Sequence, residues 1–105
     1  MFDLDIVGIY IPNTETIRNL LESLNYTITP VSARERREPI KYQAICFRDW
    51  ISLFERVKQT NKLYYCMNSP TLTEEQSIFI FDILHMCPDY QTFKEALQQY
   101  INNNP

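Results

Sequence analysis

The feature that most constrains the fold is an apolar run near the start of the chain, Leu4–Ile11, which is rich in β-branched residues. A run of this kind is typical of a strand that is buried on both faces of its sheet. Pro12 and Asn13 end the run, and an amphipathic helical pattern follows immediately. We therefore expect a first strand over residues 1–11, central in its sheet, with later strands joining it on either side.

The middle of the chain alternates between helical and strand patterns. Apolar residues recur at i, i+3, i+4 and i+7 in two segments, which predicts helices capped by Asn13 or Thr14 and by Asp49. Asn25 is predicted to end the first helix in a left-handed conformation. Pro30 lacks an N–H, so we expect its strand at a sheet edge. The strands expected between and after the helices cover residues 26–31, 40–47 and 63–67.

The order strand, helix, strand, strand, helix, strand is the pattern of a ferredoxin-like fold. We therefore expect one α+β domain over residues 1–105, with a βαββαβ sandwich over residues 1–67. In such a sheet the first and third strands are central, the second and third run antiparallel, and both helices cover one face. The alternative is a small open α/β sandwich with another strand order.

A helical hairpin is predicted over residues 73–102. Thr73 and Gln76 have the spacing of a capping box, which marks a helix start. Apolar residues between Ile78 and Leu84 point to every side of this helix, so it must be buried on more than one side. The hairpin therefore covers the second face of the sheet or pairs with another chain, and burial within the chain is the usual outcome.

Charge is unevenly placed along a chain whose net charge is −3. Residues 34–48 contain five basic and two acidic side chains, whereas residues 69–105 contain five acidic side chains and one lysine. This polarity favours oriented association with a charged partner. The overall negative charge disfavours a protein that coats nucleic acid.

Cysteine and glycine usage exclude several kinds of site. Three cysteines without a CxxC pair predict free thiols in a reducing compartment, hence a cytoplasmic protein. With His85 they would make four zinc ligands, but their spacing does not suit zinc, so no metal and no cofactor are expected. The single glycine argues against a phosphate-cradling loop. No apolar run is long enough to span a membrane.

The segment Ile9–Asn13 resembles the first-strand motif of RNA-recognition modules, in which an exposed aromatic residue stacks on a base. The resemblance implies that Tyr10 has this role. In the expected third strand, Tyr42 occupies one stacking position, Ala44 occupies the other, and the glycine of the family pattern is missing. The other interpretation is that these aromatic residues pack beneath the C-terminal helices.

These observations favour a non-enzymatic protein-binding module, such as an inhibitor, an immunity-type protein, a viral accessory protein or an assembly subunit. The apolar hairpin also fits a homodimer formed through the C-terminal helices or a sheet edge. The alternative is a nucleic-acid-binding module, and an enzyme or nucleotide binder is disfavoured because no general base stands out. The candidate binding residues are Arg34, Arg36, Arg37, Lys41, Tyr10 and Tyr42.

Overall fold

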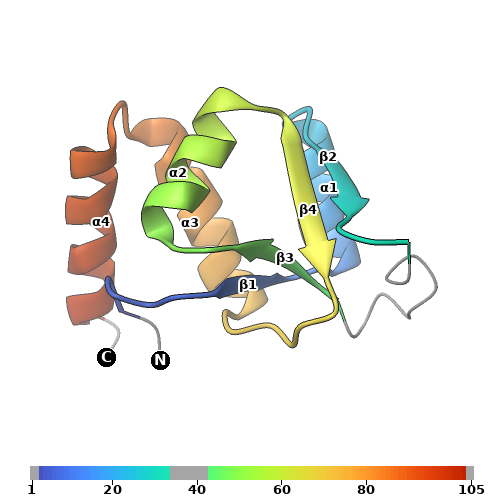
Figure 1. The fold of residues 1–105 in the computed structure, drawn as a ribbon. Coiled ribbons are helices and arrows are strands. Elements are labelled where there is room, and N and C mark those ends of the chain that lie inside the picture. Colours follow the sequence, from blue (N-terminus) through green and yellow to red (C-terminus); the bar gives the residue numbers. More distant parts are fainter. Residues whose placement is uncertain (1–2, 34–42, 104–105) are drawn as a thin grey trace.

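The computed structural model describes residues 3–33 and 43–103, which form a four-stranded sheet and four helices (Figure 1). The fold is mixed α/β, as expected. The strands are β1 (Ile9–Pro12), β2 (Thr27–Pro30), β3 (Ala44–Phe47) and β4 (Lys62–Cys66). The helices are α1 (Glu15–Ser23), α2 (Trp50–Gln59), α3 (Glu74–Met86) and α4 (Tyr90–Asn103).

The strand order is β1-β3-β4-β2, so the sheet does not have the expected ferredoxin-like order. β3 runs antiparallel to both β1 and β4, and β2 runs parallel to β4. The prediction that β1 is central is wrong, because it lies at an edge. The predicted pairing of β2 with β3 is also wrong, because β4 lies between them. The prediction that Pro30 places β2 at an edge is confirmed.

The first strand is shorter than expected because the backbone changes direction at Gly8. Gly8 has a φ of +81°, a conformation that side-chain-bearing residues rarely adopt, and β1 begins at the next residue. Residues 3–8 are not part of a strand. The outer edge of β1 is bonded by the segment before α3: the Thr71 N–H donates to the Tyr10 carbonyl at 2.8 Å, and Thr71 Oγ1 accepts from the Tyr10 N–H at 3.0 Å.

The local helix signals are confirmed. Asp49 caps α2 by accepting a hydrogen bond from the Ser52 N–H at 2.9 Å. Asn25 ends the first helical unit with a φ of +66°. The capping box at α3 is complete, because Thr73 Oγ1 accepts from the Gln76 N–H at 3.1 Å and Gln76 Oε1 accepts from the Thr73 N–H at 2.9 Å. Each of these features depends on residues that are close in sequence. They can therefore be predicted without knowledge of the tertiary fold.

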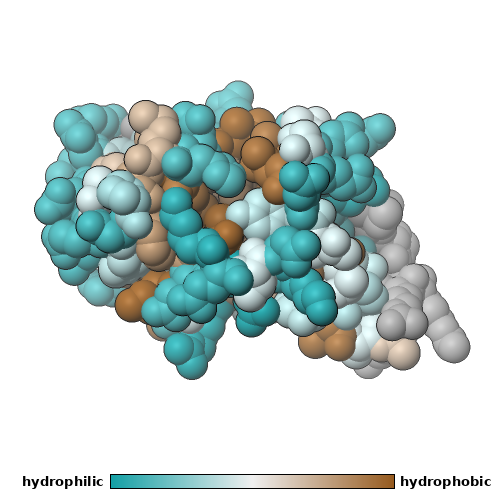
Figure 2. All heavy atoms as spheres, turned by 90° about the horizontal axis from the view of Figure 1, so that it is seen from above, coloured by the Kyte–Doolittle hydropathy of each residue, from teal (hydrophilic) through white to brown (hydrophobic). Residues whose placement is uncertain are grey.

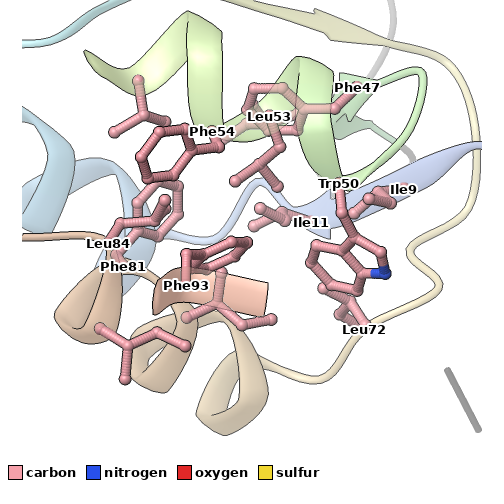
Figure 3. Packing of buried hydrophobic residues seen from close by; sticks show 14 of the residues in the cluster. Ile9, Ile11, Phe47, Trp50, Leu53, Phe54, Leu72, Phe81, Leu84 and Phe93 are labelled. Carbon is pink, nitrogen blue, oxygen red and sulfur yellow. The ribbon is translucent and has the colours of Figure 1, made fainter. Parts of the chain in front are cut away.

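One hydrophobic core joins the sheet to all four helices. Ile9 and Ile11 of β1 point to the same side as Leu53 of α2, and Phe81 of α3 and Phe93 of α4 pack there too (Figure 3). The expectation that the C-terminal hairpin covers the opposite face of the sheet is therefore wrong. The reason is that α1 lies against β2 while α2 lies against β3 and β4, which leaves the core side of β1 for α3 to cover.

Aromatic contacts fasten α4 to α2. The Phe93 ring lies 5.6 Å from the Phe54 ring and 6.3 Å from the Trp50 ring, measured between centroids (Figure 3). The Trp50 indole N–H donates to the Asp3 carbonyl at 2.7 Å, which ties the N-terminal segment to the same cluster. The C-terminal helix is therefore an integral part of the core.

Replacing Thr73 with Ala should lower the free energy of unfolding by about 1 kcal/mol, because the cap of α3 loses its hydroxyl acceptor. Urea denaturation measures this change. Thr73→Ser keeps the hydroxyl and is the matched control, which should stay within about 0.5 kcal/mol of the parent. Equal losses in the two variants would contradict the capping role.

Candidate functional site

The face of the sheet opposite the core carries partly exposed side chains. Tyr10 of β1 lies in register with Cys46 of β3, and both are half-buried. Tyr64 of β4 is 37% exposed, whereas the next core-facing residue before it, Leu63, is fully buried. Alternate residues of a strand point to opposite faces, so these three side chains belong to the non-core face. Of the described helices, α2 reaches this group, because its Arg56 lies over the Tyr64 ring.

A hollow opens on this face where β3 and β4 separate. Ladder pairing between these strands runs through Ala44–Cys66 and Ile45–Tyr65, and beyond it the Cys46 thiol donates to the Tyr64 carbonyl at 3.6 Å. The first turns of α2 close the other side. The hollow has a volume of about 600 Å³. Its described lining is Val31, Cys46, Phe47, Arg48, Ser52, Arg56 and Tyr64.

A second hollow of about 330 Å³ adjoins the first, because Cys46, Phe47 and Arg48 line both. Its other lining residues are Val7, Gly8 and Tyr10. We call the two hollows together the sheet-face surface. Val7 is 80% exposed at one end of it and Val31 is 58% exposed at the other. Two exposed aliphatic residues therefore flank a centre of aromatic, thiol and guanidinium groups.

Gly8 positions Tyr10 on this surface. The Gly8 N–H donates to the Arg48 carbonyl at 2.7 Å, which joins the segment before β1 to the end of β3. A Cβ atom at Gly8 would lie 3.1 Å from Tyr10 Oη and 3.2 Å from Tyr10 Cε2. The tyrosine ring therefore lies against the bare glycine backbone, where a larger residue would push it away.

The charge on the sheet-face surface is positive. The Arg56 guanidinium lies over the Tyr64 ring, 5.3 Å from its centroid. Arg48 Nε lies 3.5 Å from Asp49 Oδ2, but the Arg48 side chain is 79% exposed and can still meet a partner. Neither hollow has a carboxylate among its described lining residues. The surface thus combines apolar groups with two guanidiniums.

Asp49 contacts both the start of α2 and Arg48 of the sheet-face surface. The backbone N–H of Ser52, the Ser52 hydroxyl and the nearby Arg48 all stabilise its carboxylate, and they lower the pKa of Asp49 below its ordinary value. The backbone N–H of Ser52 is the largest of these causes. The same carboxylate therefore caps the helix and holds the Arg48 side chain near the hollow.

Of the six candidate binding residues, Tyr10 lies on the sheet-face surface. Arg34, Arg36, Arg37, Lys41 and Tyr42 lie outside the described residues. Sequence reasoning missed Tyr64 and Arg56 as surface residues. The alternation of Lys62, Tyr64 and Cys66 with core-facing neighbours is the signal that could have identified Tyr64. The position of Arg56 over the Tyr64 ring depends on how α2 packs.

The cysteines and the histidine do not form a site together. None of Cys46, Cys66 and Cys87 forms a disulfide within the described residues. Within residues 3–33 and 43–103, no three histidine, cysteine or acidic side chains come close enough to hold a metal ion. Within the same ranges, every helix is too short or too polar to cross a lipid bilayer.

Comparison of the chain with protein-family models, curated proteins and solved structures finds no match. The function is therefore argued from the geometry and charge of the surface.

Replacing Gly8 with Ala should destabilise the fold by about 1–2 kcal/mol, because the new Cβ meets the Tyr10 ring and the positive φ becomes strained. Urea denaturation measures the loss. Asn25→Gly is the matched control, since glycine also tolerates a positive φ, and it should be close to neutral. A Gly8→Ala variant as stable as the parent would contradict the assigned role of this glycine.

The lowered pKa of Asp49 predicts a stability that depends on pH. A carboxylate with a depressed folded-state pKa contributes stability above its ordinary pKa of 3.8 and loses that contribution as pH falls through the folded value. Between about pH 6 and about pH 2.5 the parent should therefore lose more unfolding free energy than Asp49→Asn, which keeps the cap without the charge. Parallel denaturation curves against pH would contradict this assignment.

Proposed function

We propose that this chain is a non-enzymatic protein-binding module whose contact surface is the sheet-face surface. The observation that carries the proposal is the composition of its larger hollow, in which exposed Val31 and Tyr64 lie beside Arg48 and Arg56. Aromatic and arginine side chains dominate the energetics of protein interfaces, and concave apolar centres with polar surroundings are where such side chains act. The shape therefore suits an inserted apolar side chain from a partner.

The charge of the surface defines the partner more closely. With two guanidiniums and no lining carboxylate, the surface favours a segment that carries Asp or Glu next to an apolar anchor. Arg56 lies over the Tyr64 ring at the hollow, where its planar fork suits a bidentate contact with a carboxylate. We infer that the recognised feature is an acidic, partly apolar protein segment.

Nucleic-acid binding is the alternative, because the same surface holds aromatic rings and guanidiniums. Two observations count against it. Arg56 covers one side of the Tyr64 ring, and the Tyr10 ring lies against Gly8, so each ring offers a base less free area. The net charge of −3 also opposes binding to a polyanion. A protein partner therefore fits the surface better.

The decisive experiment is selection from a displayed peptide library against the intact chain, followed by affinity measurement on a selected peptide. We expect enriched sequences to pair Asp or Glu with Leu, Phe or Ile. The double substitution Arg48→Glu and Arg56→Glu should weaken binding about tenfold or more, because attraction becomes repulsion. The control is Lys58→Glu with Lys94→Glu, which makes the same charge change away from the hollows. It should change the affinity by less than about twofold.

A parallel titration with single-stranded RNA and DNA tests the alternative. Tight binding that weakens steeply with salt, and that is lost when Arg34, Arg36 and Arg37 become Ala, would favour nucleic acid and overturn the proposal. Enriched peptides without acidic residues, or equal losses in the two double variants, would also contradict the proposed surface.

A further inference from the structure

A second groove lies between α1 and α3, away from the residues of the sheet-face surface. It has a volume of about 520 Å³ and is apolar over most of its lining. Leu20 of α1 and the C-cap residue Leu24 form one wall, and Ile78 and Phe79 of α3 form the other. Figure 2, which shows the molecule from above, has separate apolar areas between hydrophilic side chains on that face, so apolar surface is not confined to this groove. The described residues that line the groove come from α1, its C-cap Leu24 and α3, and no described strand residue is among them.

The groove is lined by side chains of α3 that are not fully buried in the core. Ile80, Phe81 and Leu84 of α3 are buried in the core. Phe79 is partly buried and stacks on Tyr100 of α4, with ring centroids 4.3 Å apart. Ile78 remains 38% exposed and lines the groove. The all-round apolar pattern of α3 is thus explained by the core and α4 on most sides and by this groove on the last one.

The groove has an acidic rim. Glu75 and Asp82 precede and follow Ile78 by about one turn each, so they lie on the same side of α3, and both are exposed. The described lining also contains His85, but no lysine or arginine. Because complementary charge selects partners and suppresses wrong ones, this rim favours a basic ligand and disfavours an acidic one.

We propose that the α1–α3 groove binds a basic amphipathic helix of a partner protein. Its apolar residues, at helical spacing, lie on Leu20, Leu24 and Ile78, and its lysines or arginines face Glu75 and Asp82. A helix is the fitting occupant because the walls are helices, whose backbone groups are already paired, so a strand would find no ladder to join. This groove and the sheet-face surface have opposite charge, which would let the chain hold an acidic and a basic partner together.

The test uses a helical peptide of about four turns with a leucine stripe flanked by lysines. A second peptide has glutamate in place of each lysine. Fluorescence anisotropy against the intact chain should show that the basic peptide binds about tenfold or more tightly than the acidic one. Glu75→Lys with Asp82→Lys should reverse this preference. Glu55→Lys with Glu95→Lys makes the same charge change outside the groove and should preserve the preference.

Ile78→Ser is a further variant that leaves the rim charges intact, and it should weaken the basic peptide several-fold by removing an apolar anchor. Circular dichroism confirms that each variant is folded. The proposal would be overturned if both peptides bound equally or if both double variants lost the preference to the same extent. It would also be overturned if Ile78→Ser left binding of the basic peptide unchanged. Self-association that sedimentation detects in the parent and not in the Glu75, Asp82 variant would also overturn it, because a second copy would then fill the groove.

Discussion

The packing of α4 on α2 through Phe93 is the constraint on which the rest of the structure depends. The Phe93 ring is fully buried and contacts the rings of Phe54 and Trp50, which come from the helix that covers β3 and β4. Burying a side chain of this size contributes about 1.5–3 kcal/mol, so the cluster accounts for a large share of the marginal stability of a small domain. The cluster also forces the C-terminal helices onto the side of the sheet that α2 already occupies.

The placement of the candidate surfaces follows from that one-sided core. Because the described helices all join the core face, Tyr10, Cys46 and Tyr64 remain accessible on the other face. The separation of β3 from β4 then gives this face a hollow, and Gly8 holds Tyr10 beside it. On the core side, the fit of α3 against β1 and α4 leaves Ile78 over a groove along α1. The groove is therefore a consequence of how the C-terminal helices pack, whereas the sheet-face surface depends on the strands, Gly8 and α2.

The parts of the fold that the sequence predicted are those decided by neighbouring residues. Asp49 and Thr73 cap their helices because each hydroxyl or carboxylate reaches an N–H three residues ahead, and Pro30 fixes an edge strand because it lacks a donor. The strand order could not be predicted, since it depends on which apolar faces meet across long stretches of chain. The run Leu4–Ile11 favours a long central strand by composition, but the positive φ of Gly8 and the bonds to Thr71 shorten β1 and close its edge. Of the predicted binding residues, Tyr10 was identified through the resemblance to RNA-recognition modules and lies on the sheet-face surface. Arg56 could not be found from the sequence, because its position over Tyr64 depends on the tertiary packing of α2.

A double-mutant cycle between Phe54 and Phe93 tests this account most directly. The free energies of unfolding of the parent, Phe54→Leu, Phe93→Leu and the double variant give the coupling between a side chain of α2 and one of α4. If both helices pack in one core, the two rings should be coupled by about 0.5–1.5 kcal/mol, the range for aromatic pairs in contact. Additive losses, with coupling near zero, would mean that α4 lies away from α2 and would contradict the one-sided core.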